Sequence, residues 1–393
     1  MRLAIVCYPT FGGSGVVASE LAMQLADRGH QVHVVSHDAP FRLDRWRQNL
    51  FMHCVGVGDY PLFRYPPYTL NLTNKLIELV HEHGVELIHS HYAIPHAHAA
   101  WMAREVLRSE GREIALACTL HGTDITLVGR EPGFHALTRF AIDRQDLITT
   151  PSAWLADETA QHFGVVRSRI QVIPNFVDLQ RFSPKRDCQA RRCLAPKDAA
   201  IITHASNFRP VKRVDEVVGA FAILRRRRNA VLLLVGDGPD LAKAEQQARD
   251  LGVRDDIRLL GQQERIEEVL QASDLFLLPS RAESFGLAAL EAMACGCPVL
   301  GYRAGGLPEV VEDGVSGILC AEGAHACLGS VAADLLDDQE RYAAMRRAAR
   351  ARAERFAESA VIEHYERALQ SLVPGKQVAY GSDVRRPTSD VPK

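Results

Sequence analysis

The 393-residue sequence lacks long apolar segments and lacks an excess of charge of either sign. Its longest wholly apolar runs, such as residues 230–235, have the length of a strand, whereas a membrane-spanning helix needs about 18 apolar residues. The 46 lysines and arginines against 48 aspartates and glutamates leave a net charge of −2, too little to attract nucleic acid or an anionic membrane. We therefore expect a globular protein with no nucleic-acid partner and no membrane insertion.

Paired cysteines are also missing. The nine cysteines are an odd number and include no Cys-x-x-Cys pair, as expected of thiols that are kept reduced in a cytosol. The apolar run at residues 3–7 meets a proline and is too short for the core of a signal peptide. These features predict a cytoplasmic protein.

Sixteen histidines raise the hypothesis of a metal site, above all at His89 and His91 and at His96 and His98. Residues two apart face the same way on a strand, so the first two could converge, whereas the last two would diverge on a helix. We favour ordinary strand-end and cleft histidines here and predict no metal site.

Short β-branched runs alternate with segments of helical period, which is typical of βαβ units and a parallel sheet. In the first half the expected strands are residues 3–7, 32–36, 86–91, 114–120, 147–150 and 170–173, with helices such as 15–28 and 70–83. In the second half they are residues 200–205, 230–236, 257–260, 275–278, 298–301 and 317–320. Two doubly wound sheets in tandem would place the carboxyl ends of both across one cleft.

The prolines and charges of residues 174–186 interrupt this alternation and indicate a connection between two domains. We predict a first domain over residues 1–175, a second over 176–372 with terminal helices at 326–336, 339–356 and 358–372, and a flexible tail over 373–393. The basic run at 225–228 favours an exposed helix end over a polyanion site.

Two glycine-rich loops follow expected strands. Residues 11–15 (Phe-Gly-Gly-Ser-Gly) lie between the first strand and the first helix, where a ligand can approach bare backbone amides, but a tight turn explains them equally well. Residues 236–239 (Gly-Asp-Gly-Pro) precede a helix whose acidic start is equally a cap, so this loop alone decides little.

A pair of glutamates carries more information. Glu283 lies in a loop, and Glu291 lies about a turn and a half into the helix that Gly286 opens. Both carboxylates can face the cleft beside free amides at the helix start. Amides suit phosphate and carboxylates suit sugar hydroxyls, so this arrangement favours a phosphate-bearing, hydroxyl-rich ligand.

Cations and a histidine end two other expected strands. Arg209, Lys212 and Arg213 follow the first strand of the second half, where they can neutralise a diphosphate leaving group. His121 ends the strand at residues 114–120 and would bring an imidazole into the same cleft from the first half.

The chain resembles the retaining GT-B glycosyltransferases that share a Glu-x7-Glu signature, here Glu283 to Glu291, over residues 1 to about 372. Within that superfamily, longer strings are similar to the N-acetyl-α-D-glucosaminyl L-malate synthases, which open bacillithiol biosynthesis. These strings are residues 7–9, 12–15, 65–68, 91–97, 119–126 and 206–209.

The resemblance implies that UDP-N-acetylglucosamine binds mainly to the second half, that L-malate binds to the first, and that the sugar passes to the malate hydroxyl with its α configuration retained. His121, Glu283 and Lys212 are then the expected catalytic residues. The expected donor-binding residues are Gly15, Ser206, Arg209, Lys212, Glu283, Phe285, Gly286, Leu287 and Glu291. Glu283 would hold sugar hydroxyls, the amides of 285–287 would surround the sugar and diphosphate, and Glu291 would bind the ribose.

Malate is a dianion and needs donors. Pattern and charge select Ser14, Tyr92, Thr119 and Arg139, together with Asn207. Many relatives have arginine where this chain has Asn207, so Asn207 is expected to reach the acceptor or the sugar instead.

No Asp-x-Asp occurs in the sequence, so the usual carboxylate pair that delivers a divalent ion to a nucleotide sugar is missing. We predict a reaction that needs no metal and no cofactor. No carboxylate of the first half stands out as a nucleophile for double displacement, which favours attack on the same face, with the leaving phosphate taking the acceptor proton.

Other functions stay open at this point. The acceptor of a related transferase would be an inositol phosphate, a lipid-linked sugar or a glucan. A UDP-N-acetylglucosamine 2-epimerase would need no acceptor, and a sensor would bind UDP without turnover. The sequence leaves a homo-oligomer open, and closure of the two domains over the donor is expected.

Overall fold

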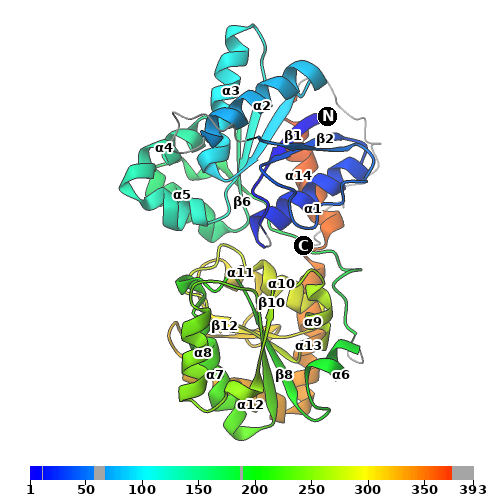
Figure 1. Ribbon diagram of the computed structural model, residues 1–393, viewed down its shortest axis with the longest axis vertical. Coiled ribbons are helices and arrows are strands. Elements are labelled where there is room, and N and C mark those ends of the chain that lie inside the picture. Colours follow the sequence, from blue (N-terminus) through cyan, green and yellow to red (C-terminus); the bar gives the residue numbers. More distant parts are fainter. Residues whose placement is uncertain (11, 57–66, 186–188, 374–393) are drawn as a thin grey trace, which may run out of the picture.

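Two parallel β-sheets organise the chain, and the computed structural model describes residues 1–10, 12–56, 67–185 and 189–373 (Figure 1). The strands of the first sheet are β1 (Arg2–Val6), β2 (Gln31–Ser36), β3 (Leu50–Cys54), β4 (Leu87–His91), β5 (Ala115–Thr119), β6 (Leu147–Thr150) and β7 (Ile170–Val172), in the order β3-β2-β1-β4-β5-β6-β7. Those of the second are β8 (Ala200–Ala205), β9 (Ala230–Val235), β10 (Ile257–Gly261), β11 (Leu275–Leu278), β12 (Val299–Tyr302) and β13 (Gly317–Cys320), in the order β10-β9-β8-β11-β12-β13.

Helices cover both faces of each sheet. Those of the first half are α1 (Ser14–Asp27), α2 (Tyr68–His83), α3 (His98–Ser109), α4 (Pro132–Asp143) and α5 (Ala153–Phe163). Those that follow are α6 (Gln189–Leu194), α7 (Val214–Arg227), α8 (Leu241–Asp250), α9 (Ile266–Ala272), α10 (Leu287–Ala294), α11 (Leu307–Val310), α12 (His325–Asp337), α13 (Gln339–Glu354) and α14 (Glu358–Gln370). The prediction of two tandem, doubly wound parallel-sheet domains is therefore confirmed.

The last helix departs from the sequence-based division, which placed residues 358–372 with the second domain. Val361, Ile362 and Tyr365 of α14 are buried in the same apolar cluster as Leu3 and Ile5 of β1. Figure 1 shows α14 beside α1 and β1 of the upper domain. The chain thus returns to the first sheet, where α14 joins α1 in covering one apolar face. The predicted tail, apart from residue 373, lies outside the described residues.

The sequence analysis also missed β3. This strand lies at the edge of the first sheet, and residues after Leu50 are at least partly exposed. Its sequence, Leu-Phe-Met-His-Cys, contains no β-branched residue and so lacks the usual strand signal. It nevertheless pairs with β2 over its whole length.

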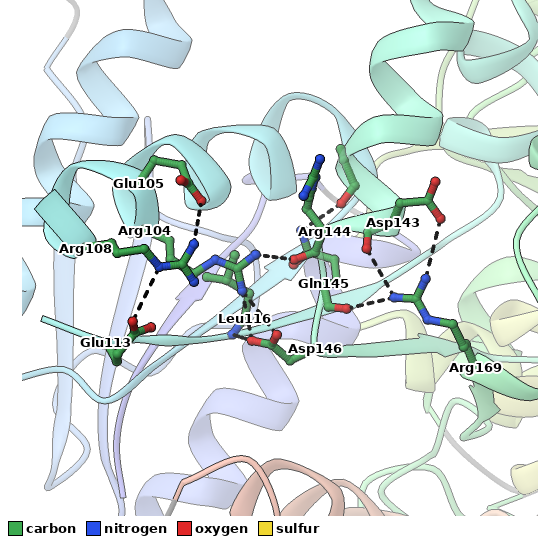
Figure 2. Close-up of polar contacts among 11 residues, drawn as sticks. Arg104, Glu105, Arg108, Glu113, Leu116, Asp143, Arg144, Gln145, Asp146 and Arg169 are labelled. Atoms are coloured by element: carbon green, nitrogen blue, oxygen red, sulfur yellow. Dashed lines mark hydrogen bonds and ion pairs between the residues drawn. The ribbon is translucent and has the colours of Figure 1, made fainter.

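Polar contacts secure the edge of the first sheet that lies away from the carboxyl ends of the strands (Figure 2). Asp146, just before β6, accepts hydrogen bonds from Arg104 at 3.1 Å and from the Leu116 amide at 2.8 Å. Arg104 also donates to the Arg144 carbonyl at 2.5 Å, and Arg169 donates to the carbonyl of Asp143. The last carbonyls of α4 thereby find partners that the helix itself cannot supply.

The basic run at 225–228 ends α7 as expected. Arg225 pairs with Asp256 at 2.9 Å, and Arg227 pairs with Asp334 at 2.7 Å. Arg228 lies 3.3 Å from Asp337. These partners support the exposed helix end over a polyanion site. In the part of the chain that the structure describes, no helix combines the length and the apolar character needed to cross a bilayer.

Candidate active site

The carboxyl ends of the two sheets meet at a cleft, and several contacts join its two sides. A Cβ atom on Gly122, which follows β5, would lie 2.8 Å from Cβ of Ser284, which follows β11. The Ser152 hydroxyl donates to the Ser284 carbonyl at 2.6 Å. Glu309 of α11 accepts hydrogen bonds from the amides of Ala153 and Trp154 at the start of α5, each at 2.8 Å. The two halves are therefore in direct contact around the site.

Lys212 and Glu283 form the centre of the second half of the cleft. Lys212 follows β8 in a short 3-10 turn, and Glu283 lies in the loop after β11. The Lys212 ammonium donates to Glu283 Oε1 at 2.5 Å, and the Glu283 side chain is 9% exposed. Two residues that the sequence analysis chose separately are thus brought together as an ion pair.

The start of α10 supplies backbone amides beside this pair. Gly286 has φ of +99°, a conformation that favours glycine, and a Cβ there would lie 2.9 Å from Leu307 Cδ1. The Phe285 side chain points into the core against Phe356, with ring centroids 5.6 Å apart. The main chain of residues 285–287 is therefore what this segment can offer to a ligand, at the positive end of a helix.

Glu291 has a partner that the sequence analysis did not identify. Arg42, in the loop after β2, donates to Glu291 Oε1 at 2.9 Å and to Glu20 Oε1 of α1 at 3.0 Å. All three side chains are at most 12% exposed. Burial raises the pKa of Glu20 to about 7, although the Arg42 guanidinium opposes this rise. No motif marks Arg42, which is 249 positions from Glu291.

Of the three cations after β8, Lys212 and Arg209 lie at the cleft, whereas Arg213 is paired with neighbouring carboxylates. Arg213 is bound to Asp215 at 3.0 Å and to Glu216. Arg209 is exposed and forms no ion pair with the described residues. Burial raises the pKa of the Tyr92 phenol, and the positive charge of Arg209 opposes this rise. Arg209 therefore lies close enough to act on a group of the first half.

Ser206 and Asn207 form the turn that carries these cations. The Ser206 hydroxyl lies 2.8 Å from Nε2 of His204 and accepts from the Phe208 amide at 3.2 Å. Asn207 is exposed. A Cβ on Gly236 would lie 1.9 Å from the Ser206 carbonyl oxygen, and one on Gly238 would lie 2.1 Å from that of Asn207. The second glycine loop thus allows two stretches of backbone to pass each other closely.

On the first half, the Ser14 hydroxyl donates to the Tyr92 hydroxyl at 3.0 Å. Tyr92 has φ of +86°, an uncommon conformation for a residue with a side chain. The amide of Gly15 donates to Thr10 Oγ1 at 3.2 Å, and a Cβ on Gly15 would lie 2.6 Å from the same atom. This supports the tight-turn interpretation of the first glycine loop, in which the Gly15 amide already has a partner.

His121 reaches the cleft in a neutral form. Its Nε2 lies 2.8 Å from Nδ1 of His91, and burial lowers the pKa of His121 to about 3. Asp124, which the sequence analysis quoted without a role, accepts from the amides of His121, Gly122 and Ala93 at 2.9 to 3.1 Å. One buried carboxylate therefore fixes the loops that carry both Tyr92 and His121.

Thr119 and Arg139 are the other two residues that the first half contributes to the expected acceptor set. Thr119 has no exposed surface, and its hydroxyl lies 2.8 Å from His89 and 2.7 Å from Thr149, beside Tyr365 of α14. Arg139 lies on the outer surface of α4, 58% exposed, next to Asp143. The returning α14 covers the face that holds Thr119, and the helix surface directs Arg139 to solvent. The Thr119 carbonyl accepts a hydrogen bond from the Tyr92 amide at 3.0 Å, so Thr119 lies beside Tyr92 with its side chain buried. Among the described residues, no contact joins Arg139 to Ser14 or Tyr92.

Aromatic side chains that the sequence analysis did not single out surround Tyr92. Tyr8 follows β1, and its ring centroid lies 5.7 Å from that of Tyr92 and 4.4 Å from that of His96. Tyr68 at the start of α2 lies 5.9 Å from His37, and its buried hydroxyl has no hydrogen-bond partner among the described residues. In the sequence, Tyr8 and Tyr68 were marked only by the strings at residues 7–9 and 65–68 that carry the family resemblance. The cluster offers hydroxyl and imidazole groups to a polar ligand.

The histidines considered for a metal site have other partners. The rings of His89 and His91 lie 4.6 Å apart, but His89 contacts Thr119 and His91 contacts His121. Nδ1 of His96 lies 2.6 Å from the His91 carbonyl, and His98 lies against Trp101. Within the described ranges these four residues form no group of three ligands.

Known families match both halves of the chain. The family described as Glycosyltransferase Family 4 matches residues 11–181, and the one described as Glycosyl transferases group 1 matches residues 186–352. The chain is 42% identical to N-acetyl-alpha-D-glucosaminyl L-malate synthase of Bacillus anthracis, over 93% of this chain and 96% of that protein. It is 31% identical to D-inositol 3-phosphate glycosyltransferase of Saccharomonospora viridis, over 92% of this chain and 90% of that protein.

Solved structures share the fold at lower identity. Anabaena Alr3699/HepE in complex with UDP and glucose superposes with a TM-score of 0.82 at 22% identity, over 95% of this chain and all of that one (100%). Sucrose-phosphate synthase of Thermosynechococcus elongatus gives a TM-score of 0.80 at 21% identity, over 95% of this chain and 99% of that one. Together with the two sheets, these likenesses confirm the GT-B fold.

Glu20 makes stability depend on pH. Its pKa is raised in the folded protein, so the folded state holds the proton more tightly than the unfolded state. The free energy of unfolding then falls as the pH rises from about 4.5 to about 7. We expect Glu20→Gln to remove this loss. When the pH is raised from 5 to 7.5, the free energy of unfolding of the variant, measured in urea, should therefore increase by about 1–3 kcal/mol relative to that of the wild type.

The matched control for this measurement is Glu363→Gln, since Glu363 is 59% exposed and pairs at the surface with Arg367. It should follow the wild type at both pH values. A Glu20→Gln variant whose stability runs parallel to that of the wild type would show that Glu20 does not hold its proton in the fold.

Proposed function

We propose, from the premise that the chain belongs to the group 1 glycosyltransferases, that it transfers N-acetylglucosamine from UDP-N-acetylglucosamine to the hydroxyl of L-malate. The α configuration is retained, UDP is released, and the reaction is the first step of bacillithiol biosynthesis. The 42% identical relative bears the name of this synthase, which supports the choice of both substrates. The observation that carries the proposal is the ion pair between the partly exposed Lys212 and the buried Glu283, beside the start of α10.

The donor lies along the second half. Lys212 and Arg209 neutralise the diphosphate, and the amides of residues 285–287 complete its binding. Glu283 accepts hydrogen bonds from sugar hydroxyls, and Glu291 accepts them from the ribose while its other contact is Arg42. His121 stands at the sugar as a neutral hydrogen-bonding group, since its pKa of about 3 excludes the charged form at neutral pH.

The acceptor lies against the first half. Ser14 and Tyr92, joined at 3.0 Å, present hydroxyls to malate, and Asn207 and Arg209 approach from the opposite side. The charge of Arg209 acts on Tyr92, and Arg209 has no carboxylate partner among the described residues, so it can also balance one of the malate charges. This set leaves out Thr119, whose buried hydroxyl is engaged with His89 and Thr149, and Arg139, which is exposed on α4.

The reaction proceeds on one face of the sugar. The bond between the anomeric carbon and the diphosphate oxygen breaks, the malate oxygen bonds to that carbon, and the hydroxyl proton passes to the leaving phosphate. The Asp124 carboxylate accepts three backbone hydrogen bonds and is 2% exposed, which supports this route over a double displacement through that carboxylate. Lys212 and Arg209 supply the positive charge, and we propose that no divalent ion takes part. The reaction takes place in the cytosol, as the unpaired thiols suggest.

A phosphorylated inositol is the second candidate acceptor, because relatives that are 31% identical are named D-inositol 3-phosphate glycosyltransferases. A single assay separates the two. The protein is incubated with UDP-N-acetylglucosamine and EDTA, alone or with L-malate or inositol 3-phosphate, and both UDP release and product mass are followed.

We expect UDP release that depends on malate, with the mass of a glucosaminyl malate and no effect of EDTA. UDP release that occurs only with inositol 3-phosphate would show that this compound, and not L-malate, is the acceptor. A sugar epimer formed without any acceptor, or UDP binding without turnover, would contradict the proposed transfer.

The acceptor site is tested by Tyr92→Phe. Loss of the hydroxyl removes one hydrogen bond, so the KM for L-malate should rise about 5- to 10-fold, while slow hydrolysis of the UDP-sugar without malate stays within about twofold of the wild type. Arg139→Ala is the control, because Arg139 is exposed on α4 and should change neither value. A malate KM that rises in Arg139→Ala but not in Tyr92→Phe would place the acceptor elsewhere.

A further inference from the structure

Three histidines meet on the first domain, away from the cleft. His33 lies on β2, His53 lies on β3, and His83 is the last residue of α2. Each offers one ring nitrogen, and the three nitrogens all lie within 4.8 Å of one another. Among the described residues this is the group of His, Cys, Asp and Glu side chains that could hold a metal ion.

The sheet and helix geometry brings these side chains together. β2 and β3 are parallel, with His33 opposite Phe51, so His53, two residues further along β3, faces the same side of the sheet. That side also holds Val35 and is covered by α2. The helix ends at His83, so its last turn brings this ring over the two strands, and β2 and α2 can be followed in the upper domain of Figure 1.

The distances fit a metal ion bound by imidazoles. Nδ1 of His33 lies 2.9 Å from Nε2 of His53. The ring of His83 lies 4.8 Å from that of His33 and 5.7 Å from that of His53, centroid to centroid. In a tetrahedral zinc site with Zn–N bonds of about 2.0 Å, the nitrogens are about 3.3 Å apart. The His83 side chain is 42% exposed, so its ring is the one of the three that can adjust toward a bound ion.

The chemistry of the surroundings is consistent with a borderline transition-metal ion. The His33 ring stacks on Phe51 at 5.1 Å and is 3% exposed, so it is held in place. The His83 side chain is 42% exposed, which leaves the fourth position open to water. Three imidazoles with one open position suit zinc better than magnesium or calcium, which prefer oxygen ligands.

We propose that His33, His53 and His83 bind one zinc ion that links the edge strand β3 to β2 and to the end of α2. The site is separate from the cleft, since α2 ends just before β4 begins, whereas Tyr92 and the other cleft residues follow the strands. Its role is to stabilise the outer edge of the first domain. Glycosyl transfer does not pass through it.

The test uses the full chain after dialysis against EDTA. Cobalt is titrated first, because tetrahedral Co²⁺ gives visible absorption bands, and zinc affinity is then measured by competition with a chromogenic chelator. We expect one equivalent to bind with Kd at or below the micromolar range. His53→Ala and His83→Ala should each weaken binding at least 100-fold, and one equivalent of zinc should raise the Tm of the wild type by several degrees but not that of His83→Ala.

Two control variants distinguish this site from other donors nearby. His81→Ala removes an exposed histidine of α2 that contacts Glu110, and Cys54→Ala removes the exposed thiol next to His53. Both should bind zinc as the wild type does. Because His83 is on the surface, its variant should fold normally, as circular dichroism can verify. Absence of stoichiometric binding, unchanged affinity in His83→Ala, or loss of binding in Cys54→Ala would each overturn the proposal.

Discussion

The arrangement of charged side chains in the cleft follows from the free-energy cost of burying two carboxylates. Glu283 and Glu291 lie within one loop and helix of the second half, and each is less than 10% exposed. An unpaired charge in such a position costs several kcal/mol, so each needs a cation at hydrogen-bonding distance. Lys212 supplies it from the same half, and Arg42 supplies it from the other half. The second ion pair therefore also holds the two domains together at the site.

The two sides of the cleft differ in charge as a result. The second half contributes the ion pairs, the exposed Arg209 and the start of α10, whereas the first half contributes hydroxyls and neutral imidazoles around Tyr92. This difference in charge is what the proposed function requires, with an anionic, phosphate-bearing donor on the second side and a small hydroxyl-bearing acceptor on the first. Asp124 stays bound to backbone amides and maintains the loops between them.

Much of this was predictable from sequence, and the failures have physical causes. The alternation of strands and helices predicted both sheets, and local motifs selected Lys212 and Glu283 separately, whereas their ion pair became evident only in the structure. The edge strand β3, which has no β-branched residue, and Arg42, which acts through a contact across the cleft, left no local signal. A sequence pattern also does not reveal that α14 returns to the first sheet, where the Thr119 side chain is buried beside Tyr365.

The central claim is that the Lys212–Glu283 pair forms the donor site, and calorimetric titration of UDP tests it most directly. We predict that Lys212→Gln weakens UDP binding about 10- to 100-fold, and that the double variant with Glu283→Gln, which leaves no unpaired buried charge, remains equally weak. Lys243→Gln, at a lysine 68% exposed and away from the pair, should change the Kd less than about twofold. Equal affinities for all variants and the wild type would contradict this assignment.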